Sequence, residues 1–408
     1  MIAVLIFAGF ALSSFFVFQV TDVYWQVIAQ SFLEGKMNMN ELFIGSQFIN
    51  DFAIFEGRVY FPLGPLPALM FIPFMPIIQL LDIRNFQSIF VIAMNTINIW
   101  LLFSLARKCK LTTQQALWMV LAFFLGSVYI GVAFFSLTSY VSHVLATLWV
   151  LAALNEFFGR RRYWFIGLLM SFAFATRQTA GLGIAFFMLY IFFEQSELDI
   201  FRALKYFRTR SQNLLRLLLP FALMVVLLMM YNFVRFHNIF ESGYSYQLIT
   251  GTLKEFRDIG VFHIHHVLFN VYHSLFALPR LVYDSNGHLS FPFVWVSGFG
   301  MSMLFTSPYL VWLRRMNFRD PLSQKLLITV ILIFGVLMAF FASGTHQYGY
   351  RYSLDFLPYL FTALMFGIAS GRIALSKRLQ TVIMLSVLVN LYFVIFSVFP
   401  IFTAWPTF

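Results

Sequence analysis

The protein has 408 residues, of which 61% are hydrophobic, 20% are aromatic and only 11% are charged. Its mean hydropathy of +0.82 is far above that of soluble domains, in which about 25% of residues are charged. This composition excludes a soluble fold, a disordered scaffold and a nucleic-acid-binding domain. The net charge of +11 is instead expected in short cytoplasmic loops, where membrane proteins concentrate Lys and Arg. We predict an all-α integral membrane protein.

Residues 1–20 are apolar but lack a charged start and a small-residue cleavage site, so we expect a retained first span and not a removed signal peptide. The single cysteine, Cys109, excludes an intrachain disulfide and a cysteine-based metal cluster. No internal repeat or soluble domain interrupts the sequence. Residues 1–408 are therefore predicted to form a single polytopic transmembrane domain.

About eleven transmembrane helices are predicted from apolar stretches that can cross roughly 30 Å of hydrocarbon. They lie at about 1–20, 86–106, 114–134, 139–158, 214–232, 291–313, 325–343, 356–371 and 379–399, and 163–194 is expected to form a hairpin of two short spans broken near Arg177. The stretch 66–81 is short and carries three prolines, so we expect a juxtamembrane or re-entrant helix there.

The basic residues fix the predicted orientation. With 66–81 excluded as a span, 18 of the 27 Lys and Arg residues fall on one side of the membrane, which the positive-inside bias identifies as the cytoplasm. They are Arg107, Lys108, Lys110, Arg160–Arg162, Arg202, Lys205, Arg208, Arg210, Arg216, Arg314, Arg315, Arg319, Lys325, Arg372, Lys377 and Arg378. The extracytoplasmic side then receives a first loop, 21–85, and a second large loop, 233–290. It also receives the turn at 177–179, the segment 344–355 and seven of the eight histidines, the exception being His143 within a span.

Asp22 follows the first span and opens the first loop. A carboxylate at a membrane boundary is costly unless it is solvated, paired or used, so Asp22 is either a helix-end residue in the headgroup layer or a functional group. The spacing of Tyr24, Ala29 and Phe32 predicts an amphipathic helix that Gly35 ends. The loop that follows is long, and long loops in compact folds are usually functional.

Further along this loop, Asp51, Glu56, Arg58 and Tyr60 precede a run of prolines. Gly57 suits a tight turn, and the prolines stiffen the chain before the short helix begins. Such a rigid frame can hold Asp51 or Arg58 against a ligand. Asp51 can equally cap a helix or pair with Arg58.

Three further segments place cations on the same side. Arg177 lies where two short spans meet, and it either snorkels to the headgroups or clamps a phosphate or carboxylate. Arg235 and His237 follow the span that ends near residue 232. His346 and Arg351 alternate with Tyr348, Tyr350 and Tyr352, and the tyrosines alone would suit an ordinary aromatic belt.

A metal site receives little support. His263, His265, His266 and His273 fit no standard ligand spacing, and no acidic cluster accompanies them. The motifs of zinc proteases, serine hydrolases and nucleotide-binding folds are absent from the sequence. We expect no cofactor and no metal ligand.

Taken together, these segments resemble the GT-C membrane glycosyltransferases, and in particular the bacterial and archaeal relatives of polyprenyl-phosphate-mannose protein mannosyltransferases. The resemblance covers residues 1 to about 360. It rests on TDVYWQVIAQSFLEG after the first span, DFAIFEGRVYFPLGPLP, Arg177 between the short spans, RFHNIFESGY, and GYRYSLDFLP. The sequence departs from relatives with an acidic pair at the first of these segments, since Asp22 stands between Thr21 and Val23.

The resemblance implies a hexosyltransferase-like enzyme that moves a sugar from a polyprenyl-phosphate donor to a hydroxyl of an acceptor glycan, lipid or protein. By resemblance, Asp22 would be the general base. Arg177 and Arg351, with Arg58 as a further candidate, would bind the lipid phosphate, and Tyr60, His346 and Tyr352 would shape the sugar site. Asp51 and Arg235 complete the expected substrate-binding set. The site would face outside the cytoplasm of a prokaryotic plasma membrane.

Two alternatives remain at this stage. A transporter or flippase for a lipid-linked saccharide would place polar residues near the middle of several spans and often has repeated halves, whereas the spans here are nearly devoid of central charges. A non-catalytic relative could serve as an assembly subunit.

Overall fold

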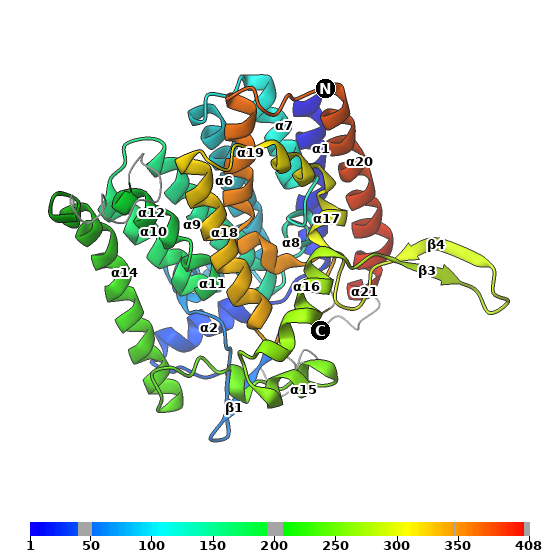
Figure 1. The fold of residues 1–408 in the computed structure, drawn as a ribbon. Coiled ribbons are helices and arrows are strands. Elements are labelled where there is room, and N and C mark those ends of the chain that lie inside the picture. The colour runs from blue at the N-terminus through cyan, green and yellow to red at the C-terminus, as the bar shows by residue number, and fades with distance from the viewer. Residues whose placement is uncertain (40–50, 194–206, 346, 404–408) are drawn as a thin grey trace.

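The computed structural model describes residues 1–39, 51–193, 207–345 and 347–403. Within these ranges the chain is mostly helical, with two small antiparallel hairpins (Figure 1). Six helices have the length and apolar composition of membrane spans. They are α1 (Ile2–Gln19), α6 (Phe86–Lys108), α9 (Thr138–Phe157), α14 (Phe207–Phe236), α18 (Pro321–Ala339) and α20 (Lys377–Phe393), the last continuing through the π-helix η7 (Val394–Val398) into α21 (Phe399–Thr403). The predicted count of about eleven spans is not confirmed.

Shorter apolar helices complete the bundle. They are α7 (Thr113–Phe124), α8 (Ile130–Ala133), α10 (Tyr163–Thr176), α11 (Gln178–Gly181), α12 (Ile184–Phe193) and α19 (Leu357–Ala369). The predicted break at Arg177 is confirmed, because Arg177 adopts an extended conformation between α10 and α11. Outer helices expose large apolar side chains such as Phe7 on α1 and Leu223 on α14. Exposed apolar faces of this extent are typical of an integral membrane protein.

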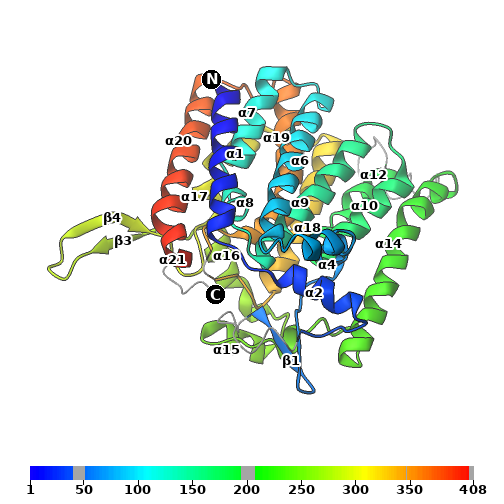
Figure 2. The same ribbon diagram turned by 180° about the vertical axis from the view of Figure 1, so that it is seen from behind.

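The loops gather at one end of the bundle, opposite the N-terminus (Figures 1 and 2). We call this the loop end, formed by the described residues of 20–85, 237–302 and 340–356. It carries α2 (Tyr24–Leu33), β1 (Ala53–Phe55), β2 (Arg58–Tyr60), α4 (Leu66–Phe71), η2 (Ile72–Phe74) and α5 (Met75–Leu80). It also carries η3 (Tyr244–Tyr246), α15 (Thr252–Ile259), η4 (Ile264–His266), α16 (Val267–Leu275), β3 (Arg280–Tyr283), β4 (Leu289–Trp295) and η6 (Arg351–Asp355). The helices predicted after Asp22 and over 66–81 are therefore present, and Gly57 occupies the tight turn between β1 and β2 at a φ of +71°.

The prediction of a helical span at 291–313 is wrong. These residues form β4, α17 (Met303–Thr306) and the 3-10 helix η5 (Pro308–Arg315). Pro292 and Pro308 lack the N–H group that a continuous helix needs, and Gly298 and Gly300 weaken it further. The segment is also not uniformly buried, since Phe291 on β4 is exposed whereas Tyr309 is fully buried and donates a hydrogen bond to the Ala122 carbonyl at 2.8 Å.

Irregular backbone inside the bundle is stabilised by one amide side chain. The predicted span 114–134 is interrupted after α7, which leaves the Leu125 carbonyl without a helical partner, and α17 ends at Thr306. Asn390 of α20 donates from Nδ2 to both carbonyls at 3.1 Å. Tyr348 in turn donates to Asn390 Oδ1. Broken helices are tolerated at membrane depth when neighbouring side chains supply such partners.

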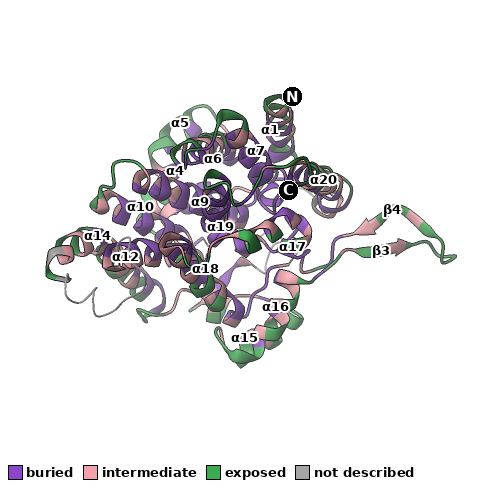
Figure 3. Ribbon diagram, turned by 45° about the horizontal axis from the view of Figure 1, so that its top comes forward, coloured by how far each residue is buried: buried purple, intermediate pink, exposed green. Residues whose placement is uncertain are grey.

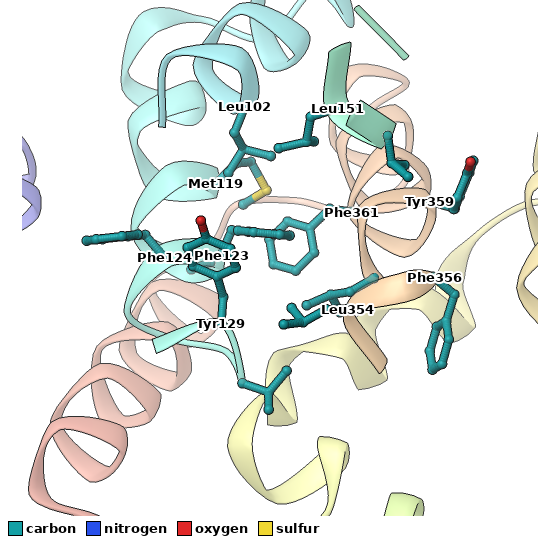
Figure 4. Packing of buried hydrophobic residues seen from close by; sticks show 14 of the residues in the cluster. Leu102, Met119, Phe123, Phe124, Tyr129, Leu151, Leu354, Phe356, Tyr359 and Phe361 are labelled. Carbon is teal, nitrogen blue, oxygen red and sulfur yellow. The ribbon is translucent and has the colours of Figure 1, made fainter. Parts of the chain in front are cut away.

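The core lies between α6, α7, α9 and α19, of which α9 is the most completely buried (Figure 3). Phe123 packs its ring against Tyr129 and Phe361, with centroid separations of 5.1 and 4.9 Å, and Leu102 and Met119 fill the space beside them (Figure 4). These rings fix α19 against α7 and the segment that leads into α8. The start of α9 and η6, the short helix just before α19, each supply one wall of the cavity described next.

Candidate active site

A cavity of about 320 Å³ lies at the loop end, within the usual size range of small-ligand sites. Segments far apart in the sequence form its walls: the loop 61–64, the first turns of α9, the junction of α10 and α11, the loop 241–247, the end of α18 and the start of η6. Its polar lining includes Asp51, Ser139, His143, Arg177, Thr179, Glu241, Tyr244, Arg351 and Tyr352. Two carboxylates, two guanidinium groups and an imidazole therefore share one space.

Gly64 permits one wall of this cavity. A Cβ atom at Gly64 would lie 2.0 Å from the carbonyl oxygen of Ala175. The loop 61–64 therefore crosses directly over the end of α10. Only glycine allows this close approach of two backbones, and Phe61, Pro62 and Arg177 all line the cavity.

Arg177 lines the cavity as part of a buried ion pair. Its Nε and Nη2 donate to the two carboxylate oxygens of Asp355 at 2.9 and 3.1 Å, and the Thr179 hydroxyl donates to the same carboxylate. The side chain of Asp355 is fully buried and that of Arg177 is 9% exposed. This bidentate pair joins the α10–α11 junction to η6. It leaves Nη1 without a hydrogen bond among the described residues.

Arg351 approaches the cavity from η6. Its Nη1 donates to the Thr345 carbonyl at 3.3 Å and to Gln347 Oε1 at 3.1 Å. Its Nε is buried and has no hydrogen-bond partner in the described part of the chain. The guanidinium carbon lies 5.0 Å from the Tyr140 ring centroid and 5.4 Å from that of Tyr352. A charged donor with open hydrogen-bonding capacity can bind a phosphate or carboxylate.

Tyr352 connects the cationic groups to a histidine that sequence reasoning had placed in a span and not in the site. The guanidinium of Arg177 lies 5.0 Å from the Tyr352 ring centroid, and the His143 ring stacks on Tyr352 with centroids 5.6 Å apart and an interplanar angle of 23°. His143 lies on the second turn of α9 and lines the cavity. The polar run Ser136, Thr138, Ser139, Ser142 and His143 was the available signal.

Two carboxylates lie near this end of α9. Asp51 lines the cavity; burial raises its pKa, and the positive charge of Arg351 partly opposes this effect. Asp22 does not line the cavity. Burial raises the pKa of Asp22 to about 6, hydrogen bonds from Thr138 and Gln87 oppose that rise, and the charge of Asp51 adds to it.

The carboxylate of Asp22 holds the start of α9. It accepts hydrogen bonds from the Thr138 amide at 2.8 Å, the Thr138 hydroxyl and Gln87 Nε2 at 2.9 Å. An anion at a helix N-terminus satisfies unpaired N–H groups and is favoured by the helix dipole. Asp22 thus ties the end of α1 to the starts of α6 and α9.

The remaining predicted site residues lie elsewhere. Arg235 is buried at the end of α14, where it donates to the Phe61 carbonyl at 3.0 Å and holds the loop 61–64. Arg58 and Tyr60 line a second cavity, of about 590 Å³, between α2 and β2. Tyr60 packs on Phe236 with centroids 5.1 Å apart. His346 lies outside the described residues.

The histidines of the second loop do not converge. His266 Nε2 lies 2.8 Å from the Gly260 carbonyl, and the amide of His265 donates to His263 Nδ1 at 3.2 Å. Across the described ranges, no three His, Cys, Asp or Glu side chains are grouped as metal ligands. The prediction of a metal-free site remains a prediction.

The sequence matches no family model and no curated protein. Among solved structures, the chain is similar to the Archaeoglobus fulgidus oligosaccharyltransferase, crystallised tethered through a disulfide bond to an acceptor peptide containing the NVT sequon. The sequence identity is 12% and the TM-score is 0.41. The alignment covers 98% of this chain and 55% of that protein, so the chain spans about half of its length.

Proposed function

We propose that this protein is a membrane glycosyltransferase that transfers a sugar from a polyprenyl-phosphate donor to an acceptor hydroxyl. The observation that carries the proposal is the cavity at the loop end, where Asp51, His143 and Arg351 approach one space from three distant segments. The acceptor oxygen attacks the anomeric carbon, the bond between that carbon and the phosphate oxygen breaks, and the acceptor proton passes to a carboxylate. The polyprenyl phosphate leaves with an added negative charge.

Arg351 is the proposed phosphate ligand. Its buried Nε has no partner, so a phosphate oxygen would satisfy it without displacing a protein group. Preorganised charge of this kind stabilises a leaving group most effectively inside a water-poor site. Arg177 would bind the same phosphate through its Nη1, while the ion pair with Asp355 fixes the position of its guanidinium.

Asp22 and Asp51 are the candidates for the general base, since Glu241, which also lines the cavity, accepts a hydrogen bond from the Gly243 amide at 2.6 Å in its own loop. The resemblance assigned this role to Asp22, whose pKa near 6 suits a base. However, Asp22 is engaged by Thr138 and Gln87 and does not line the cavity. A base must reach the proton it removes, and this requirement favours Asp51. We therefore assign proton transfer to Asp51 and the anchoring of α9 to Asp22.

The position of the basic clusters, at the end of the bundle opposite the cavity, supports an extracytoplasmic site. Lys108 at the end of α6 donates to the Asn155 carbonyl near the end of α9 at 2.8 Å. The clusters at 107–110 and 160–162 therefore lie at the same end of the bundle. The cavity lies at the opposite end, beside the start of α9. With basic clusters in the cytoplasm, the cavity would open on the outer side of a prokaryotic plasma membrane.

The transporter alternative has less support. A path across the membrane would need open polar groups along the spans. Two amides in the middle of α6 are instead engaged: Asn95 accepts a hydrogen bond from the Tyr129 hydroxyl, and Asn98 donates to that hydroxyl and to the Val144 carbonyl.

The test is sugar transfer in reconstituted vesicles. Purified protein is mixed with a series of radiolabelled undecaprenyl-phosphate hexoses and with membrane extract as the acceptor source. Wild-type protein should transfer label from at least one donor, and Asp51→Asn should lower the rate by about 10²-fold or more. Asp258→Asn, in an exposed position on α15, is the matched control and should retain the wild-type rate. Absence of transfer by the wild type from every donor would contradict the proposed function.

A further inference from the structure

His143 has two buried ring nitrogens without a hydrogen-bond partner. The side chain is 1% exposed, and neither Nδ1 nor Nε2 contacts a donor or acceptor in the described part of the chain. Native proteins rarely leave buried polar atoms unsatisfied. Because His143 lines the cavity, the missing partners can come from a ligand.

The surroundings of His143 define the kind of ligand. A neutral imidazole offers one donor and one acceptor. Phosphate oxygens would engage the donor nitrogen alone. A metal ion would need further ligands, and the described residues hold no group of three ligating side chains. A ring bearing hydroxyl groups supplies donors and acceptors together.

Two neighbours strengthen this match. Tyr352 stacks on His143 and presents its ring to the same cavity. Ser139 lies one helical turn before His143 on α9, also lines the cavity, and adds a hydroxyl. The Arg351 guanidinium carbon also lies 5.4 Å from the Tyr352 ring centroid, where it can hold a phosphate attached to such a ring.

We propose that His143, supported by Tyr352, binds the sugar ring of the donor and distinguishes a sugar-bearing polyprenyl phosphate from the free polyprenyl phosphate. This inference rests on the proposed function and adds a residue that binds the sugar while Arg351 binds the phosphate. His143 contacts the substrate but carries no proton in the transfer step.

The experiment compares two ligands by binding. Undecaprenyl phosphate and the undecaprenyl-phosphate hexose that the wild type transfers are titrated against purified protein in nanodiscs. His143→Phe keeps a flat ring against Tyr352 but removes both nitrogens. Its affinity for the sugar-bearing lipid should fall about tenfold, which corresponds to the loss of about one hydrogen bond. Its affinity for undecaprenyl phosphate should stay unchanged. His143→Asn, which keeps a donor and an acceptor, should restore part of the difference.

The outcomes separate the two proposals. Equal loss for both lipids in His143→Phe, or no loss for either, would overturn the role of His143 while leaving the transferase proposal intact. Failure of the wild type to bind either lipid would overturn both. Arg351→Gln provides the complementary result, since it should weaken binding of both lipids. Thermal unfolding of each variant identifies a loss of binding that is caused by misfolding. If His143→Phe is misfolded, the affinities of His143→Asn for the two lipids decide whether His143 binds the sugar.

A second inference comes from the β3–β4 hairpin, which does not contribute to the cavity. It projects sideways from the bundle at the level of α21 in both views (Figures 1 and 2). Leu281, Leu289 and Phe291 are half or more exposed. An isolated two-stranded hairpin is marginal in water, so an apolar environment must cover these side chains.

The hairpin is continuous with the apolar outer face of α20. The Phe291 ring lies 5.4 Å from that of Phe396, which is itself 40% exposed, and Tyr392 donates to the Pro292 carbonyl. Since α20 is a candidate span whose outer face would meet lipid, we infer that the hairpin lies in the lipid interface. Aromatic residues favour this layer of the membrane.

Spin labelling tests this inference. Phe291→Cys in a Cys109→Ser background is labelled with a nitroxide and placed in phosphatidylethanolamine–phosphatidylglycerol nanodiscs. The label should be relaxed more by oxygen, which concentrates in lipid, than by a water-soluble nickel chelate. Asn286→Cys, at the exposed turn, should show the opposite order. Preferential relaxation by nickel at position 291, or protection from both agents as in contact with a second protein, would overturn the inference.

Discussion

Two buried polar regions lie side by side at the loop end, and they differ in how their hydrogen bonds are satisfied. In the first, both oxygens of the Asp355 carboxylate accept hydrogen bonds, which Arg177 and Thr179 donate. In the second, His143 and the Nε of Arg351 have no partner among the described residues. Tyr352 touches both regions.

The difference separates structural groups from binding groups. A satisfied network holds distant segments together, and its loss should appear as lost stability. Groups left open around a cavity contribute little to stability, and their loss should appear as lost binding.

The largest loss of stability is expected from Asp355→Ala. It leaves the Arg177 guanidinium buried and uncompensated, which costs about 3–5 kcal/mol. The free energy of unfolding can be measured in detergent by denaturant titration. The double variant Arg177→Met/Asp355→Ala removes the unpaired charge and should recover most of the loss. Equal instability of the single and double variants would contradict a structural ion pair.

Asp22 should make stability depend on pH. Its pKa of about 6 in the folded protein exceeds the ordinary value near 4, so the folded state binds this proton more tightly than the unfolded chain does. The stabilisation from proton binding is therefore complete below about pH 4 and is lost as the pH rises through 6, amounting to about 3 kcal/mol. Asp22→Asn cannot titrate. Relative to wild type, this variant should gain stability between pH 4 and pH 7, and a constant difference would refute the prediction.

Asn390→Leu should cost about 1–3 kcal/mol. The substitution keeps a similar volume but leaves the Leu125 and Thr306 carbonyls and the Tyr348 hydroxyl without their partner. The melting temperature in detergent checks this expectation. Gln380→Leu, which removes a partly buried hydrogen bond to a single carbonyl at the start of the same helix, should have a smaller effect.

Arg351→Gln should have the smallest effect, about 1 kcal/mol or less, because removal of an unpaired buried N–H offsets the lost hydrogen bonds. The same variant should nevertheless weaken undecaprenyl phosphate binding by about tenfold or more. The two quantities are measured on one preparation. A large loss of stability with unchanged binding would place Arg351 in the structural region instead.

Much of the loop end could be predicted from local sequence. The helix after Asp22, the turn at Gly57 and the break at Arg177 each follow from local backbone preferences. Asp51, Arg177 and Arg351 were identified because charged residues are rare in so apolar a chain, and the structure places all three around one cavity.

The remaining features depend on distant contacts. The partner of Arg177 is 178 residues away, and the partners of Asp22 lie on two different helices, so neither pairing can be recognised locally. His143 was assigned to an ordinary span because the stretch 139–158 is apolar as a whole, despite the polar residues in its first turns. The 291–313 segment was predicted as a span because composition alone does not separate a lipid-crossing helix from an exposed strand, as at Phe291, followed by a buried segment, as at Tyr309.

The central claim is that the cavity beside His143 and Arg351 binds a lipid-linked sugar. The most direct test is a cryo-electron microscopy structure of the protein in nanodiscs with the undecaprenyl-phosphate hexose that it transfers. The account predicts density in the cavity, with the phosphate beside Arg351 and the sugar against His143 and Tyr352. An empty cavity with the lipid phosphate bound elsewhere on the protein would contradict it.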